Sequence, residues 1–295
     1  MAWKCLRHQN LLPLLGVTMT ENRFVMASEW MVKGNVREFL KKDASADRLE
    51  LVRSRSRSLS LTMTLLLQLR GVARGLVYMH DQGIIHGNLR GVRIQTRSHS
   101  LLPNSPDPKT NVLIDDNGHA CLTDFGLVTL TSDEPTVTSS IGATTAQWMS
   151  PELLVPDKFG LKESRPTEAS DCYALGMVIY EILSGQTPFI QYSNHAVVWR
   201  ILEGERPRRP EGEQGVWFTD DIWGISERCW KPQPTDRIGV KTVLLDLERH
   251  PPLRPPSNVN GSVEIDGNDR SDTTSSDSKY VFYFTPYSSL SVLAF

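Results

Sequence analysis

Three residues within positions 84–126 carry side chains that could act on a charged substrate. Asn88 and Asn111 offer amide oxygens, and Asp124 offers a carboxylate. Such oxygen atoms are the ligands that hard cations prefer. A carboxylate also accepts a proton near neutral pH, whereas an amide oxygen is far too weak a base. This set could therefore hold a cation and orient a hydroxyl group.

Two short predicted strands position two of these residues. Asn111 precedes the apolar run 112–114, and Asp124 follows the run 120–123. Asn117-Gly118 between the runs is a strong signal for a tight hairpin. The hairpin brings Asn111 and Asp124 to neighbouring strand ends, where their oxygens could share one cation.

The same stretch resembles the catalytic centre of a protein kinase. It contains His86-Gly87-Asn88-Leu89-Arg90, then Asn111, then Asp124-Phe125-Gly126, in the order of the H-R-D-L-x-x-x-N and D-F-G elements. The resemblance implies that Asn111 and Asp124 hold the Mg2+ ions that bridge the phosphates of ATP. The implied reaction is transfer of the γ-phosphoryl group to a hydroxyl of a protein substrate.

Asn88 departs from the pattern, because the family keeps its catalytic Asp at this position. Losing a general base typically slows a reaction by roughly 100- to 10,000-fold, about 3–5 kcal/mol of barrier. An amide can still orient the hydroxyl, so residual activity stays open. Arg90 stands where many Ser/Thr kinases have a Lys that contacts phosphate, and it keeps the positive charge in a different shape.

Residues 23–27 are predicted as a strand, and Ser28-Glu29-Trp30-Met31 after them resembles a kinase hinge. By this resemblance Ser28 is the gatekeeper, and the backbones of Glu29 and Met31 contact the adenine of ATP. Taken alone, these four residues also suit an ordinary strand end. The run at 34–40 resembles the short helix that follows a kinase hinge.

The first 33 residues resemble only the later part of a kinase small lobe. No G-x-G-x-x-G loop, V-A-I-K lysine or αC glutamate precedes the hinge, and these parts clamp the ATP phosphates. About two strands of small-lobe sheet are predicted, and a lone two-stranded hairpin is marginally stable in water. We therefore expect apolar residues such as Leu12 and Phe24 to need cover from further sequence or from a partner.

Two segments, residues 52–68 and 92–109, interrupt the resemblance. Residues 69–80 have the pattern of an amphipathic helix, and removing 52–68 joins Leu51 to Leu69 in a continuous kinase-like helix. Asn88 and Asn111 are 23 positions apart, whereas the template needs five, and removing 92–109 restores that spacing. If translated, the second segment is expected to hinder the active geometry.

Both segments begin with Val-Arg and end in Gln or Lys. The codons of these residues fit the GT and AG ends of introns, so we hypothesise that both segments are retained introns. Two alternatives stay open. The Arg-Ser run at 53–58 could be a phosphorylatable basic tail that binds RNA or a splicing partner, and both segments could be tolerated surface loops.

The sequence after position 126 resembles a kinase large lobe. Trp148-Met149-Ser150-Pro151-Glu152 resembles the A-P-E element, which implies a buried structural pair between Glu152 and Arg237. Residues 173–183 are apolar nearly all round, which predicts a buried helix that Gly185 ends. The resemblance implies that Asp171 anchors the backbone of the catalytic loop, with helix capping as a compatible alternative.

Other features of this lobe concern regulation and subfamily. A Thr/Ser-rich stretch at 129–145 resembles an activation loop, and a mobile polar loop without regulation is the alternative. Its candidate phosphorylation sites are Thr136, Thr138, Ser139, Ser140, Thr144 and Thr145. Helical patterns follow at 197–203, 222–229 and 240–248. Cys229-Trp230-Lys231-Pro232 with Asp236-Arg237 resembles the end of tyrosine-kinase and tyrosine-kinase-like domains, although Ile238 replaces the usual Pro.

Composition points to an ordinary soluble protein. The 295 residues are 39% apolar with a net charge of −2, which gives no global attraction to nucleic acid or membrane. No apolar run reaches the ~18 residues of a membrane span, and no secretory signal is recognised. Cys5, Cys121, Cys172 and Cys229 are scattered without a C-x-x-C motif. Free thiols in a reducing, cytoplasmic (intracellular) compartment are therefore predicted.

These patterns predict an α+β, protein-kinase-like fold. It consists of a partial small β lobe and hinge (1–33), a nearly complete, mainly α-helical large lobe (34–250), and a disordered tail (251–295) whose aromatic run at 280–284 is an aggregation hazard. The predicted function is that of a protein kinase domain using ATP and Mg2+, weak or inactive, with a protein substrate or a partner kinase. A pseudokinase binding module and a mis-spliced or defective product are the alternatives.

Overall fold

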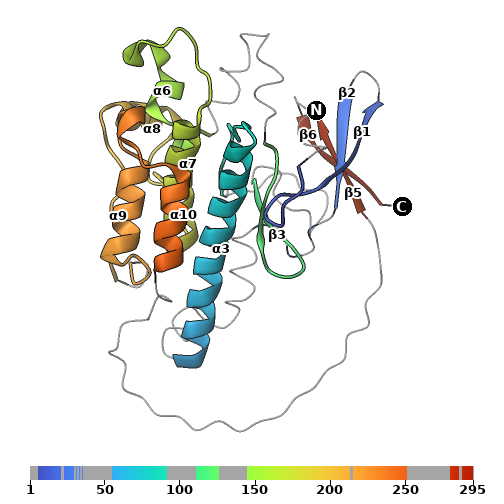
Figure 1. Cartoon of the computed structure of the whole chain (residues 1–295). Helices are drawn as coiled ribbons and strands as arrows, with labels where there is room; N and C mark the ends of the chain where they lie inside the picture. The colour runs from blue at the N-terminus through green and yellow to red at the C-terminus, as the bar shows by residue number, and fades with distance from the viewer. Residues whose placement is uncertain are drawn as a thin grey trace.

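The computed structural model describes residues 6–20, 23–29, 31, 33, 35, 55–91, 111–125, 145–212, 215–250, 280–285 and 288–294. Its strands are β1 (Leu14–Thr20), β2 (Arg23–Ser28), β3 (Val112–Ile114), β4 (Ala120–Leu122), β5 (Tyr280–Thr285) and β6 (Ser288–Ala294). Its α-helices are α3 (Arg55–Asp81), α6 (Pro151–Leu154), α7 (Glu168–Ser184), α8 (Asn194–Leu202), α9 (Asp220–Cys229) and α10 (Val240–Arg249). Short 3-10 turns are η2 (Ala146–Trp148), η3 (Pro156–Phe159) and η5 (Pro234–Asp236). In Figure 1 the helices form one body and the strands lie beside it, so the predicted α+β class is confirmed.

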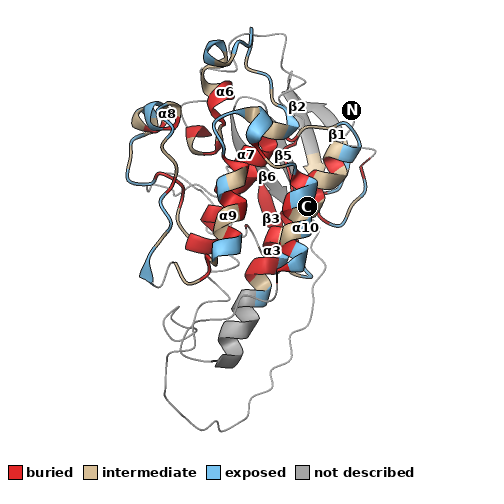
Figure 2. Cartoon of the chain, turned by 60° about the vertical axis from the view of Figure 1, so that its left-hand side comes forward, coloured by how far each residue is buried: buried red, intermediate tan, exposed pale blue. Residues whose placement is uncertain are grey.

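Helix α7 forms the centre of the helical body. Every residue from Ser170 to Ser184 is buried, as the apolar run predicted, and Figure 2 shows this helix among its neighbours. Thr167 caps its start, because the side chain accepts a hydrogen bond from the Ser170 N–H. Gly185 ends it in a left-handed conformation with φ 69° and donates its N–H to the carbonyl of Glu181. The predicted end at Gly185 is confirmed, whereas the helix starts earlier than expected, at Glu168, and its cap is Thr167 rather than Asp171.

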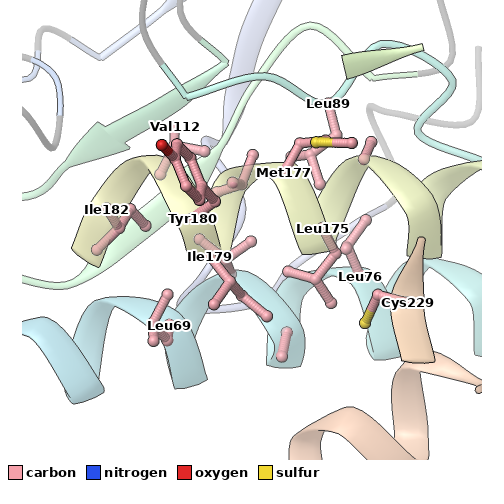
Figure 3. Packing of buried hydrophobic residues seen from close by; sticks show 14 of the residues in the cluster. Leu69, Leu76, Leu89, Val112, Leu175, Met177, Ile179, Tyr180, Ile182 and Cys229 are labelled. Carbon is pink, nitrogen blue, oxygen red and sulfur yellow. The ribbon is translucent and has the colours of Figure 1, made fainter. Parts of the chain in front are cut away.

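Side chains of α7 fill the space between two other elements. Leu175 and Ile179 lie toward Leu69 and Leu76 of α3, while Met177 points toward Leu89 (Figure 3). All of these side chains are at most 3% exposed. Burial of this kind stabilises by about 25 cal/mol per Å2 of apolar surface, so α7 is the main source of cohesion in the large lobe.

Helix α3 corrects the prediction for residues 52–68. A helix was expected at 69–80, but α3 already begins at Arg55 and continues without a break. Leu65 and Leu66 are buried and lie three or four residues before Leu69, so they extend the same apolar stripe. The side-chain amide of Gln68 also donates a hydrogen bond of 2.8 Å to the carbonyl of Gly118. Residues 55–68 are thus part of the helix, while the intron hypothesis for their origin stays a prediction.

Two of the described hairpins match predicted strands. β3 pairs with β4 in antiparallel register, from Val112 opposite Leu122 to Ile114 opposite Ala120. β1 pairs with β2, with an irregularity between Leu14 and Gly16. The segment before β1 pairs with the β3–β4 hairpin. Leu12 N–H donates to the Leu122 carbonyl, and Leu122 N–H donates to the Asn10 carbonyl, both at 2.9 Å. The N-terminal segment is therefore fastened to the large lobe.

The C-terminal tail corrects a second prediction. Residues 251–295 were expected to be disordered, yet β5 and β6 form an antiparallel hairpin within 280–294. The reason lies in the run Tyr280-Val281-Phe282-Tyr283-Phe284, since aromatic and β-branched residues favour strands. The backbone of β5 lies close to that of β2 (Figure 1).

The predicted pair of Glu152 with Arg237 is confirmed. Arg237 Nη1 and Nη2 donate to the two oxygens of the Glu152 carboxylate, each at 2.7 Å. Their side chains are 3% and 1% exposed. Arg237 Nε also donates to the Lys231 carbonyl at 2.9 Å. The pair thus joins α6 to the segment after α9.

Replacing Arg237 by Ala should lower the free energy of unfolding by about 3–5 kcal/mol, because the carboxylate of Glu152 would stay buried without its partner. Chemical denaturation followed by circular dichroism measures this loss. Arg165→Ala is the matched control, since Arg165 makes an exposed pair with Glu163 and should change stability by no more than about 0.5 kcal/mol. Equal losses in both variants would contradict the assignment.

Candidate active site

The carboxylate of Asp171 holds the loop that carries Asn88. Its two oxygens accept the backbone N–H groups of His86 and Gly87, each at 2.8 Å. The imidazole Nε2 of His80 lies 2.9 Å from the same carboxylate. Asp171 is buried, and the helix cap is Thr167. The anchoring role implied by the family resemblance is therefore confirmed.

Neighbouring residues fix the backbone of Asn88. Its N–H donates to Nδ1 of His86 at 3.3 Å, and its carbonyl accepts from the side-chain amide of Asn111. His86 is fully buried with its ring edge-on to Phe125, with centroids 6.2 Å apart. Burial lowers the pKa of His86 to about 4, so the ring is neutral at pH 7 and Nδ1 can act as the acceptor.

Asn88 and Asn111 lie together despite the 23 positions between them. The Asn111 N–H donates to the Arg90 carbonyl at 3.1 Å, which closes the chain on either side of residues 92–109. The entropic cost of closing a loop rises only slowly with its length. An insertion of 18 residues between Arg90 and Asn111 is therefore compatible with this contact. The segment was expected to hinder the active geometry, yet the contacts of Asn111 with Asn88 and Arg90 are present. The segment itself lies outside the described residues.

Asn111 and Asp124 form the candidate cation site. Thr123 N–H donates to the Asn111 carbonyl at 3.1 Å, which sets the two residues beside each other at the strand ends. The side-chain oxygen Oδ1 of Asn111 is buried and has no hydrogen-bond partner in the described part of the chain. An oxygen in that position is a natural ligand for a cation, because a buried acceptor without a partner is unfavourable. The residues present therefore fit Mg2+.

Burial also tunes the carboxylate of Asp124. It lies in a buried position with φ 59° and accepts a hydrogen bond from the Thr123 hydroxyl at 3.2 Å. Burial raises the pKa of Asp124 to about 6, although the positive charge of Arg90 acts in the opposite direction. Asp124 is therefore mostly ionised at pH 7 and gains from a cation. In the described residues no group of three or more His, Cys, Asp or Glu could hold a metal, so remaining ligands would be water or substrate oxygens.

The predicted hinge residues lie on one side of this site. Ser28 at the end of β2 is buried, Glu29 is exposed, and Met31 packs with Leu12 and Leu113. Asn35 forms an isolated bridge with Leu113 of β3. Met31 and Asn35 thus lie against the β3–β4 hairpin, while the adenine contacts of Glu29 and Met31 stay a prediction. Trp30 and residues 36–40 lie outside the described residues.

The predicted activation loop is described only at its end. Residues 126–144 lie outside the described residues, and Thr145 is buried with its hydroxyl 3.8 Å from Sδ of Met149. Thr145 is therefore closed to a modifying enzyme in this conformation, which corrects its place among the candidate phosphorylation sites. Cys121, Cys172 and Cys229 are buried free thiols, as predicted.

Sequence reasoning missed two residues that support the site. His80 is the last residue of the helix predicted at 69–80 and was given no role, yet it contacts Asp171. Glu181 lies in the last turn of α7 and accepts a hydrogen bond of 3.0 Å from the Trp148 indole. A Cβ on Gly91 would overlap the Glu181 carboxylate, so a larger residue here would require Glu181 to move. For Glu181, the available signal in the sequence was an acidic residue within an otherwise apolar run.

Comparison with known proteins decides the family. A family model described as "Protein tyrosine and serine/threonine kinase" matches residues 1–99 and 108–247. The chain belongs to the protein kinase family. The match leaves out residues 100–107, which lie inside the segment 92–109.

Curated relatives agree with this family. The tyrosine-protein kinase Abl of Drosophila melanogaster is 28% identical over 247 residues, 83% of this chain and 13% of the relative. The MAP3K epsilon protein kinase 1 of Arabidopsis thaliana is 25% identical over 251 residues, 85% of this chain and 15% of the relative. The ephrin type-A receptor 5 of Gallus gallus is 28% identical over 256 residues, 85% of this chain and 21% of the relative. The chain thus spans a small part of the length of these relatives. No helix in the described residues is long and apolar enough to cross a membrane.

The raised pKa of Asp124 predicts a pH-dependent effect of Asp124→Asn. Because the folded state holds the proton more tightly, this group stabilises the fold below about pH 4 and loses that contribution as the pH rises through about 6. Relative to the wild type, the Asn variant should gain about 2 kcal/mol between pH 4 and pH 7. Urea denaturation at both pH values, without divalent cations, measures this difference. A difference that does not change with pH would contradict the assignment.

Removing residues 92–109 should leave the fold intact and raise its stability by at most ~2 kcal/mol, because a shorter loop loses less entropy on closure. Thermal unfolding of the shortened chain measures this change. Deletion of residues 258–275, also 18 residues, is the length-matched control and should shift the midpoint little. A clearly lower midpoint after removal of 92–109 would show that the segment contributes to the fold.

Proposed function

We propose that this chain binds Mg-ATP as a protein kinase domain and transfers phosphate to protein hydroxyls weakly or not at all. The observation that carries the proposal is the contrast within one site. Asn111 and Asp124 retain the oxygen atoms that suit a cation, whereas the residue at the position of the base is Asn88. The site therefore keeps the groups that bind Mg-ATP but lacks the base that would assist transfer of the phosphoryl group.

Cation binding is supported by the chemistry of the pair. Asp124 supplies a carboxylate and Asn111 an amide oxygen, both buried at the ends of the β3–β4 hairpin. Mg2+ is usually held by one or two such groups together with substrate phosphates. When bound, the ion would neutralise charge on the phosphates.

Phosphoryl transfer is limited by Asn88. Its backbone is fixed by His86 and Asn111, so the side chain is carried on a well-defined loop and can orient a hydroxyl. An amide oxygen does not take up the proton that the hydroxyl releases. Arg90 beside it supplies a positive charge near Asp124, which favours binding of an anionic substrate without replacing the base.

The nucleotide and the acceptor are proposed on family grounds. The backbones of Glu29 and Met31 follow β2 and would contact adenine. The acceptor would be a Ser, Thr or Tyr hydroxyl of another protein. Three buried free thiols support an intracellular location.

Replacing Asn88 by Asp should raise ATP-dependent phosphorylation of a generic protein substrate by roughly 100- to 10,000-fold over the wild-type chain. Incorporation of γ-labelled phosphate measures this gain. Asn117→Asp, in the exposed turn between β3 and β4, adds the same charge away from the site and should have no effect. The proposal fails if Mg-ATP does not bind the wild-type chain or if Asp124→Ala leaves that binding unchanged.

A second candidate function is a pseudokinase module that binds a partner protein. The observation in its favour is Trp199 on α8, whose side chain is 67% exposed, since exposed tryptophans often anchor protein interfaces. Trp199→Ala should then weaken binding to a partner kinase at least tenfold in calorimetry. Asp124→Ala should leave that affinity unchanged. Loss of binding only in Asp124→Ala would favour the nucleotide-dependent function.

A further inference from the structure

Two buried thiols lie where helix α9 meets helix α7. Cys172 is in the second turn of α7, and Cys229 is the last residue of α9. They are 57 positions apart in the sequence, and 1% and 0% of their surfaces are exposed. The candidate active site uses neither thiol, so their meeting is a separate feature of the fold.

The end of α9 lies directly against the backbone of α7. A Cβ added to Gly176 of α7 would lie only 2.8 Å from the Cβ of Cys229. Gly176 follows Cys172 by one helical turn, and a side chain at position 176 would lean back toward that turn. Cys229 occupies this space instead, among the core residues that Figure 3 shows. The side chain of Cys229 therefore lies beside the turn that carries Cys172.

Hydrogen bonds bring the two sulfur atoms together. The Cys172 thiol donates to the carbonyl of Ile238 at 2.8 Å, and the Ile238 N–H donates to the carbonyl of Arg228 at 3.4 Å. Arg228 is the residue before Cys229, so this bridge ties Cys172 to the end of α9. The two thiols also hydrogen-bond to each other. A thiol has one proton, and that of Cys172 is bound to Ile238, so Cys229 donates and the Cys172 sulfur accepts.

The surroundings keep the Cys229 thiol protonated. Its hydrogen bond with Cys172 and its burial raise the pKa of Cys229, while the charges of Arg228 and Arg237 act in the opposite direction. Because the thiolate is the reactive form of cysteine, the raised pKa slows attack on weak oxidants. The thiols are thus free in the resting chain, and their oxidation calls for a small, strong oxidant.

We propose that Cys172 and Cys229 form a dithiol site that a peroxide converts into a disulfide between α7 and α9. The observation that carries the proposal is the direct contact of two sulfur atoms from different helices. Forming the disulfide requires them to move only from hydrogen-bonding contact to about 2.05 Å. Cys229 ends α9, and helix ends open more readily than helix centres, so a molecule as small as hydrogen peroxide can enter there. The proposal does not depend on phosphoryl transfer.

The reaction takes place in two steps that balance. In the first, the sulfur of one cysteine gives up its proton and attacks an oxygen of hydrogen peroxide. The O–O bond breaks, which leaves a sulfenic acid and a hydroxide that takes up the proton as water. In the second, the other sulfur attacks the sulfenic sulfur, the S–O bond breaks, and the second hydroxide leaves as water with the proton of that thiol. The two thiols lose two electrons, and the peroxide gains them.

The disulfide would close a loop that contains α8 and most of α9. Such a link stabilises a fold mainly by restricting the unfolded chain. It also fixes the first turns of α7, where Asp171 beside Cys172 holds the catalytic loop. Oxidation would therefore reinforce the turn on which the candidate active site depends.

A chain with Cys5→Ser and Cys121→Ser tests the pair, because only Cys172 and Cys229 remain. Cys121→Ser keeps a donor for the carbonyl of Gln9, to which the Cys121 thiol donates at 3.2 Å. After treatment with hydrogen peroxide, this chain should lose two free thiols and the mass of two hydrogen atoms. Peptide mapping should find the link, and dithiothreitol should reverse it. Two remaining thiols, or a gain of oxygen without a link, would overturn the proposal.

Single-cysteine chains are the matched controls. Cys172→Ser and Cys229→Ser, each added to the two-cysteine chain, cannot form an internal disulfide. Peroxide should raise the midpoint of thermal unfolding of the two-cysteine chain by about 5–10 °C and leave both controls unchanged. An equal rise in a control, or no rise in the two-cysteine chain, would overturn the assignment.

The wild-type chain shows whether the fold selects the pair. In the folded chain, peroxide should give the link between Cys172 and Cys229 as the main disulfide. In the same chain unfolded in urea, links that include Cys5 and Cys121 should appear beside it. The same mixture of links in both states would overturn the proposal, because the folded arrangement would then not direct the reaction.

Discussion

The carboxylate of Asp171 is the interaction on which the rest of the site depends. It is buried at the start of α7 and accepts two backbone N–H groups of the loop at 2.8 Å, with His80 as a third partner. Because a buried carboxylate needs such partners, the loop can occupy one position only. Asn88 follows directly from this anchor, and Arg90 then offers its carbonyl to Asn111. The most buried helix of the large lobe, α7, thus sets the position of the loop that carries Asn88.

Spacing in the sequence and spacing in space differ at this loop. Asn88 and Asn111 are in contact through the side-chain amide of Asn111. A backbone hydrogen bond also joins Arg90 and Asn111, which stand on either side of residues 92–109 in the sequence. The contacts that close the chain here join described residues on either side of that segment, Asn88 and Arg90 to Asn111. A segment of different length could connect Gly91 to Asn111 without changing these contacts. The geometry of the catalytic loop therefore does not depend on how many residues separate Gly91 from Asn111.

The sequence was a good guide wherever one physical signal dominated. The apolar run of α7, the hairpin turn at Asn117-Gly118 and the pair of Glu152 with Arg237 were all predicted and are present. The prediction failed where two signals competed. Residues 55–68 combine an Arg-Ser run with leucines that continue the helical stripe, and packing decided in favour of helix. The tail combines a polar linker with an aromatic run, and that run forms β5, which pairs with β6. His80 was missed because its contact with Asp171 spans 91 positions.

The side chain of Asn10 has a consequence for the order in which the chain folds. Its amide nitrogen donates to the carbonyl of Ala120 at 2.8 Å, across 110 positions, and the backbone carbonyl of Asn10 accepts from the Leu122 N–H at 2.9 Å. During synthesis the N-terminal segment leaves the ribosome well before β4 exists, so it must wait for its partner. Contacts of such long range form late and slow the folding of a domain. Leu11 and Leu12 are therefore made before the strand that they meet, and chaperones have time to act on them until β4 forms.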